Sequence, residues 1–315
     1  MLYRCYRVGQ WLALTLPLAV SYWCAARLAD LQSLVAAADR HAVQRNVAAI
    51  LGAGHPGLPR VAREVFRNFA RYLVDFFRFQ RVDEDFCRRR VTVVGRDHVD
   101  QALTQGRGAI LLSAHLGNYE LGAVVASVLG YPVTVIALNH RDPQIDAFFQ
   151  RQRAVRGVRS IPVGMALRQG FLALRRNELL AILGDRDFFD HGITVEFLGR
   201  RMKVPQGPAL FSIRTGASII PAFLLREPDG VRFRFVFERP LTPSPASPPE
   251  AASVGRPLGP KVGDGVTLQR TADEAREVAR LTQAGLAVIE QYVRRYPTQW
   301  YLFRDFDRPG PWVIL

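Results

Sequence analysis

From residue 91 onward, short apolar runs with strand character alternate with segments of helical periodicity, which constrains the fold more than any other feature. The predicted strands are Val91–Val94, Ala109–Ser113, Val133–Ala137, Leu179–Leu183, Ile193–Phe197, Ser218–Leu225 and Val231–Glu238. Helical patterns lie near residues 99–105, 117–129, 143–155, 165–176 and 206–215. This alternation predicts an α/β fold with a mostly parallel or mixed central sheet flanked by helices. Because Val231–Glu238 alternates apolar residues with arginine, we expect an edge or half-exposed strand there.

The chain is long and apolar enough to bury a sizeable core, with 315 residues of which 49% are hydrophobic. We expect residues 31–315 to form one α/β domain, preceded by an N-terminal membrane anchor at residues 1–30. Residues 239–270 are rich in proline, glycine and serine, which predicts a flexible insertion within that domain. The residues that follow, Thr271-Ala272-Asp273-Glu274, have the pattern of a capping box and predict a helix that ends near Arg295.

The N-terminal segment has no charged residue from Val8 to Ala26, and Arg7 and Arg27 stand at its ends. As a helix rising about 1.5 Å per residue it would reach about 28 Å, close to the hydrocarbon thickness of about 30 Å in a bilayer. Three alternatives fit this pattern: a spanning anchor, a helix that lies in the interface, and a cleaved signal peptide. Pro17 would kink the run, and arginines on both sides leave the orientation open.

The chain carries a formal net charge of +14, and only Lys203 and Lys261 of its 42 basic residues are lysines. A positive field of this size attracts anionic lipid surfaces, nucleic acid or polyanionic substrates. No nucleic-acid reader motif is present, so we expect an anionic membrane surface and no nucleic acid as partner. Cys5, Cys24 and Cys87 lack the paired spacing of a zinc site or a disulfide framework, which fits a reducing compartment.

His115 is the main candidate for a catalytic residue, because it lies two residues after the predicted strand Ala109–Ser113, where the chain enters a glycine-containing turn. Catalytic groups in open α/β sheets are usually exposed at the carboxyl ends of strands. A histidine there can deprotonate a hydroxyl if a carboxylate holds its ring. Glu120 is the nearest carboxylate in sequence, but five residues on an ideal helix separate two side chains by about 140°. The pair can meet only in a non-helical turn, which Gly117 and Asn118 permit.

Acidic residues near two later strands are further candidates for the site. Glu196 interrupts the apolar run 193–198 and must be exposed or paired, which makes it the rival partner for His115. Asp185 and Asp187 follow the strand Leu179–Leu183 and share one side if the chain is extended. They could orient sugar hydroxyls or position Arg186, or they could form a strand-end turn with a salt bridge. Nothing in these motifs calls for a metal ion.

The segment Ser113-Ala114-His115-Leu116-Gly117-Asn118-Tyr119-Glu120 resembles the His-x4-Glu signature of the bacterial lipid A biosynthesis acyltransferase family. This family includes lauroyl and myristoyl transferases and the phosphatidylinositol mannoside acyltransferases. Further stretches agree in order along nearly the whole chain: Asn139–Pro143, Arg153–Gly157, Gly184–Phe188, Val195–Gly199, Gly207–Ala209 and Pro297–Tyr301. The form Asp185-Arg186-Asp187 resembles the mannoside branch more than the lipid A branch.

The resemblance implies an acyltransferase at the cytoplasmic face of the bacterial inner membrane. It would move a fatty acyl chain from acyl-CoA or acyl carrier protein to a hydroxyl of a membrane glycolipid, with no cofactor and no covalent acyl-enzyme. His115 would be the general base and Glu120 the motif carboxylate. Arg141 and Arg153 would bind phosphate of the donor or the lipid headgroup. Two other functions stay open: a glycerophospholipid acyltransferase, and a non-enzymatic basic membrane-binding protein.

Overall fold

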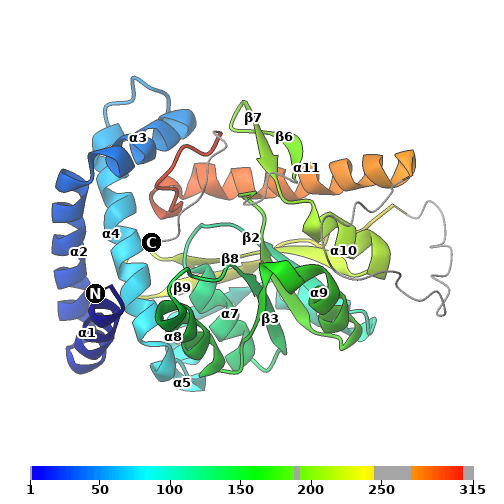
Figure 1. Cartoon of the computed structure of the whole chain (residues 1–315), viewed down its shortest axis with the longest axis horizontal. Coiled ribbons are helices and arrows are strands. Elements are labelled where there is room, and N and C mark those ends of the chain that lie inside the picture. Colours follow the sequence, from blue (N-terminus) through cyan, green and yellow to red (C-terminus); the bar gives the residue numbers. More distant parts are fainter. Residues whose placement is uncertain (1, 188–191, 245–270, 308–315) are drawn as a thin grey trace.

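The computed structural model describes residues 2–187, 192–244 and 271–307 (Figure 1). Within these residues, seven strands form one sheet in the order β1-β9-β8-β2-β5-β3-β4. All neighbours in this sheet are parallel except β8 and β9, which are antiparallel. The strands are β1 (Val91–Val94), β2 (Ala109–Ser113), β3 (Val133–Ala137), β4 (Arg159–Pro162), β5 (Leu179–Leu183), β8 (Ser218–Arg226) and β9 (Phe233–Phe237). The predicted α/β class with a mostly parallel sheet is confirmed.

Helices cover both faces of the sheet (Figure 1). One face packs against α4 (Leu58–Phe77), α6 (Arg96–Thr104), α7 (Tyr119–Val128) and α8 (Pro143–Ala154). The other face packs against α9 (Ala166–Arg175), α10 (Gly207–Thr215) and α11 (Ala272–Arg295). A short helix, α5 (Glu84–Arg90), precedes β1. Because both faces are covered, the central strands are mostly apolar and buried, as in β8, where every residue is buried.

Several predicted elements match the structure in their bounds. The apolar runs at 91–94, 109–113, 133–137 and 179–183 are the strands β1, β2, β3 and β5. The N-cap at Thr271 is also present, since the Thr271 hydroxyl accepts a hydrogen bond from the Glu274 amide at 3.1 Å at the start of α11. These elements were predictable because burial and capping are local properties of the sequence.

One prediction about strand placement is wrong, and one strand with the predicted bounds lies outside the central sheet. The segment expected at the edge of the sheet contains β9, which lies between β1 and β8 and exposes only Arg234. The run Ile193–Phe197 forms β6, which pairs with β7 (Arg200–Val204) in a separate two-stranded antiparallel sheet. The pattern of apolar residues gives the periodicity of a strand, but it does not give the identity of its neighbours.

The N-terminal apolar run is divided between two helices, α1 (Leu2–Thr15) and α2 (Leu18–Val35), and Pro17 stands immediately before α2. Among the described residues, no helix is long and apolar enough to cross a membrane. The expected boundary at residue 30 falls inside α2. This helix packs with α3 (Ala37–Leu51) and α4 in a third core cluster at one side of the molecule (Figure 1). Of the insertion predicted at 239–270, residues 245–270 lie outside the described residues.

Candidate active site

The carboxyl ends of two neighbouring strands bring a histidine and an aspartate together. Strands β2 and β5 are parallel, and Ser113 lies opposite Leu183 in their register. His115 lies two residues after Ser113, and Asp185 lies two residues after Leu183. The ring Nδ1 of His115 lies 2.8 Å from Oδ1 of Asp185. The parallel register therefore places these two side chains at one point on the sheet edge.

Asp185 is fully buried and accepts two further hydrogen bonds. Its Oδ2 accepts from the backbone amide of His115 at 3.0 Å and from the indole Nε1 of Trp300 at 3.2 Å. Burial raises the pKa of Asp185, but electrostatic interactions with His115 and Arg186 and the hydrogen bonds from His115 outweigh burial and hold this pKa below its ordinary value. An ionised carboxylate only accepts, so the His115 ring carries its hydrogen on Nδ1, and Nε2 is its basic nitrogen.

Burial also has the largest effect on the pKa of the His115 ring, and it lowers this pKa below the ordinary value of 6.5. The Asp185 carboxylate opposes this shift, and the Arg186 guanidinium adds to it. The histidine is therefore neutral at pH 7. A neutral imidazole held by a buried carboxylate has the protonation state that a general base requires.

The segment Ala114–Asn118, which we call the His115 loop, takes the non-helical turn that the sequence predicted. Gly117 has φ +65°, and a Cβ at this position would collide with the carbonyl oxygen of Leu224. The Gly117 amide donates to the carbonyl of Gln299 at 2.9 Å, and the carbonyl of His115 accepts from the Tyr301 amide at 2.8 Å. The loop is thus fixed between β8 and the segment 299–301.

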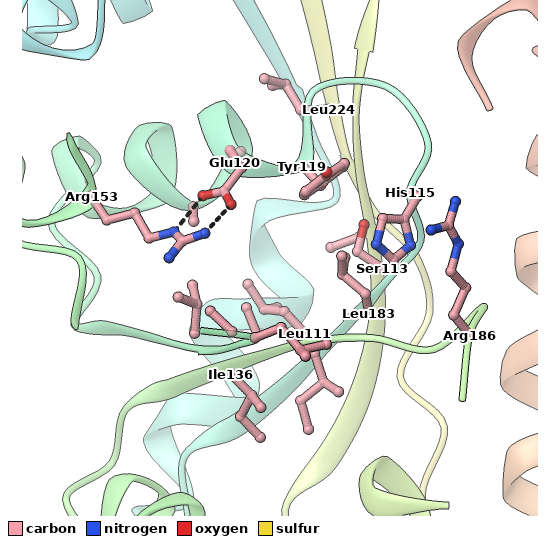
Figure 2. Close-up of a pocket in the computed structure, with 18 of the residues that line it drawn as sticks. Leu111, Ser113, His115, Tyr119, Glu120, Ile136, Arg153, Leu183, Arg186 and Leu224 are labelled. Atoms are coloured by element: carbon pink, nitrogen blue, oxygen red, sulfur yellow. Dashed lines mark hydrogen bonds and ion pairs between the residues drawn. The ribbon is translucent and has the colours of Figure 1, made fainter. Parts of the chain in front are cut away.

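A cavity of about 290 Å³ opens beside His115 on the face of the sheet that α7 covers. Its walls include alternate residues from four adjacent strands: Leu111 and Ser113, Val135 and Ala137, Ala181 and Leu183, and Ala222 and Leu224. Figure 2 shows His115 and Arg186 at one side of this cavity, with apolar side chains such as Leu111 and Ile136 below them. The arrangement suits a long apolar group whose reactive end lies at His115.

Glu120 does not hold the His115 ring, which corrects the pairing expected from the sequence. Its two carboxylate oxygens accept from Nε of Arg153 at 2.8 Å and from Nη2 at 2.5 Å (Figure 2). Both side chains line the cavity, and Arg153 is buried. Glu120 and Arg153 form a bidentate ion pair across the cavity from His115.

Glu196, the rival partner, is also not beside His115. It is exposed on β6, opposite Arg201, and does not line the cavity. Arg141 is likewise exposed and outside the lining. Arg186 does line the cavity, and its Nη2 donates to the carbonyl of Tyr301 at 2.9 Å. Asp187, also in the lining, accepts from the Gly192 amide at 2.5 Å.

The sequence did not indicate several residues of the site. Tyr72, Tyr119 and His140 line the cavity, and the Tyr119 ring meets the His115 ring edge-on with centroids 5.3 Å apart. Trp300 reaches Asp185 from the C-terminal part of the chain. The signal for Asp185 was present, since it follows a buried strand as His115 does, but its use requires knowing that β2 and β5 are neighbours.

Comparison with known proteins supplies the family. The sequence model of the bacterial lipid A biosynthesis acyltransferase family matches residues 4–306. The chain belongs to this family. It is 28% identical over 193 residues to a phosphatidylinositol mannoside acyltransferase of Mycolicibacterium smegmatis and 26% identical over 199 residues to one of Mycobacterium tuberculosis. It is also 23% identical over 137 residues to a lipid A biosynthesis acyltransferase of Haemophilus influenzae.

These matches cover only part of each relative. The two mycobacterial alignments span 60% and 61% of this chain and 64% and 63% of the relatives' own lengths. The alignment with the Haemophilus protein spans 43% of both chains. Family membership confirms the resemblance stated from the motifs, and it favours an acyltransferase as the class of enzyme.

Proposed function

We propose that this protein transfers a fatty acyl chain from a thioester donor to a hydroxyl of a membrane glycolipid, with His115 as general base. The observation that carries the proposal is the pairing of His115 with the fully buried Asp185 at an apolar cavity. The family and the names of the relatives support the reaction class and a glycolipid acceptor. The acidic partner differs from the one expected, but the role of the ring is the same.

In the proposed reaction, Nε2 of His115 takes the proton of the acceptor hydroxyl as its oxygen attacks the thioester carbonyl. The new carbon–oxygen bond forms, the carbon–sulfur bond breaks, and the sulfur leaves as thiolate. Asp185 balances the positive charge of the protonated ring through the bond to Nδ1. Arg186 lines the cavity beside the ring, where its guanidinium can stabilise the oxyanion of the tetrahedral intermediate.

The cavity is the proposed site of the acyl chain. Its lining from β2, β3, β5 and β8 is mostly apolar, so burial of the chain there is favourable at about 0.8 kcal/mol per CH₂ group. Arg153 was expected to bind phosphate, but its charge is neutralised by Glu120. We therefore assign this ion pair a structural role in the cavity wall. The exposed Arg141 stays a candidate for binding the phosphates of the donor.

We further propose that α1 and α2 lie in the membrane interface at the cytoplasmic face, where acyl thioester donors are present. The two helices expose large apolar side chains, namely Leu2, Val8, Trp11 and Leu12 on α1, and Val20, Trp23, Leu28, Leu31, Leu34 and Val35 on α2. Arg4, Arg7 and Arg27 lie in the same helices. Exposed tryptophans and arginines around an apolar face are typical of helices that lie on an anionic bilayer.

The decisive experiment is acyl transfer by the purified chain and its His115→Ala variant. The acceptors are a phosphatidylinositol mannoside, a lipid A precursor and a lysophospholipid, and the donors are acyl-CoA and acylated acyl carrier protein. Loss of the base is expected to lower the rate by about 10²–10⁴-fold. His41→Ala is the matched control, because His41 is exposed on α3 and should leave the rate unchanged. Mass spectrometry of the lipid product identifies the acceptor.

Two results would contradict the proposal. If His115→Ala keeps the full rate while both proteins are folded, the ring is not the base. If the protein acylates a lysophospholipid and neither glycolipid, it is a glycerophospholipid acyltransferase instead. The donor that supports transfer decides between coenzyme A and the carrier protein.

A further inference from the structure

A buried polar network connects the outer helix α2 with the His115 loop and takes no part in the proposed chemistry. Its centre is Asp75 of α4, which is 7% exposed. Oδ1 of Asp75 accepts from the Tyr22 hydroxyl of α2 at 2.5 Å, and Oδ2 accepts from Nδ2 of Asn118 at 2.8 Å. Arg226 of β8 also donates to Asp75. One carboxylate therefore joins two helices, the sheet and the loop.

Asn118 has two roles in this network. Its side-chain oxygen accepts from the Leu121 amide at 3.1 Å and caps α7, while its side-chain nitrogen donates to Asp75. The bond to Asp75 fixes the direction of the amide and so keeps the cap oxygen on the helix. Since Asn118 ends the His115 loop, the carboxylate fixes both the end of the loop and the start of α7, where Tyr119 lines the cavity.

The opposite side of α2 is the proposed membrane face. Tyr22 lies in the buried stripe of this helix with Ser21, Ala26, Ala29 and Ser33. Val20, Trp23, Leu31 and Leu34 are exposed on the other side. The same helix thus presents apolar groups outward and the Tyr22 hydroxyl inward, toward the carboxylate that holds the loop.

Stability alone does not explain this arrangement. A buried ion pair such as Asp75–Arg226 has a large desolvation cost, and apolar side chains of equal volume often stabilise a core as well. The pair does, however, define a single geometry for its neighbours. The Arg226 guanidinium also donates to the Tyr22 hydroxyl at 3.1 Å and to the carbonyl of Gly230 at 2.8 Å, so it is held in place as well.

We propose that Asp75 is a positioning residue, which acts through Asn118 to set the His115 loop relative to the membrane-facing helix α2. The inference rests on the proposed function, because the loop matters only if His115 is the base. Displacement of a reacting group by about 1 Å can cost about 10²-fold in rate. A change in the network should therefore reduce turnover more than it reduces the binding of substrates.

The test uses two substitutions and a matched control in the full chain. Asn118→Ser keeps an oxygen that can cap α7 but is too short to reach Asp75, and Tyr22→Phe removes only the hydroxyl from the network. Asp30→Asn is the control, because Asp30 joins α2 to α4 through Arg63 and Arg67 at 2.8 Å without touching the loop. For each variant we would measure kcat and KM for both substrates on acceptor-bearing vesicles, and the thermal midpoint.

We expect Asn118→Ser to lower kcat by about 10- to 100-fold with KM within about twofold. Tyr22→Phe should lower kcat in the same direction, and the double variant should lose no more than Asn118→Ser alone, because both act through Asp75. Asp30→Asn should lower only the thermal midpoint. The inference is overturned if Asn118→Ser and Tyr22→Phe keep the wild-type kcat, if their effects simply add, or if Asp30→Asn loses as much. A wild-type chain without transferase activity would refute the proposed function instead.

Discussion

At the scale of single residues, the charges around His115 set the pH range in which it can act as a base. Burial and Arg186 lower the pKa of the ring, and Asp185 raises it, with a net decrease from 6.5. Only the neutral ring accepts a proton, so activity is retained above this lowered pKa and is lost as pH falls through it. We therefore expect the acid limb of the kcat/KM profile to have its midpoint below pH 6.5.

The variant Asp185→Asn provides the control for this profile. Loss of the negative charge should move the acid limb to still lower pH, because the group that raises the pKa of His115 is gone. The plateau should drop by about 10²–10⁴-fold, since an amide does not hold the ring tautomer. An acid limb above pH 6.5 in the wild type, or the same limb in both proteins, would be inconsistent with this assignment.

The pair itself marks a limit of sequence interpretation at this scale. His115 was predictable from its place after an apolar strand and from its motif. From the sequence, Asp185 was expected to orient sugar hydroxyls or to position Arg186, because Glu120 is nearer to His115 along the chain. The partner depends on β2 and β5 being adjacent, and no local pattern in the sequence gives that adjacency.

At the scale of elements, β5 determines the width of the cavity through a small side chain. Ala181 lies in the middle of this strand and lines the cavity between β2 and β3. The graded series Ala181→Val and Ala181→Leu should shift the preferred donor stepwise toward shorter acyl chains, because each added carbon occupies space needed by the chain. Rates with donors of increasing chain length measure the shift. An unchanged preference in both folded variants would place the acyl chain elsewhere.

The elements also show which parts of a fold a sequence reveals. Bounds of β1, β2, β3 and β5 and the cap of α11 follow from local burial and hydrogen bonding. The central position of β9 and the separate β6–β7 hairpin do not, because both depend on which strands pair. Pro17 predicted a kink where α1 and α2 separate, but the sequence alone was also compatible with one spanning helix.

At the scale of the whole molecule, the exposed apolar face of α1 and α2 leads us to expect that the protein binds anionic bilayers. Trp11 is 63% exposed and Trp23 is 65% exposed, so neither contributes much to the core. The variant Trp11→Ser/Trp23→Ser should weaken binding to phosphatidylglycerol vesicles by tenfold or more, since burial of one large apolar side chain contributes about 1.5–3 kcal/mol. Co-sedimentation measures the binding. Leu172→Ser is the control, because Leu172 is 40% exposed on α9, which covers the opposite face of the sheet from α4, α7 and α8. Equal loss in both variants would argue against a specific face.

The segment 299–301 determines when the site around His115 can be completed during synthesis. Its backbone bonds the His115 loop at Gly117 and His115, and the Trp300 indole bonds Asp185. During synthesis, a chain that already contains every strand of the sheet still lacks these contacts. The contacts that hold the His115 loop and Asp185 can therefore form only after α11 and the residues that follow it have been made.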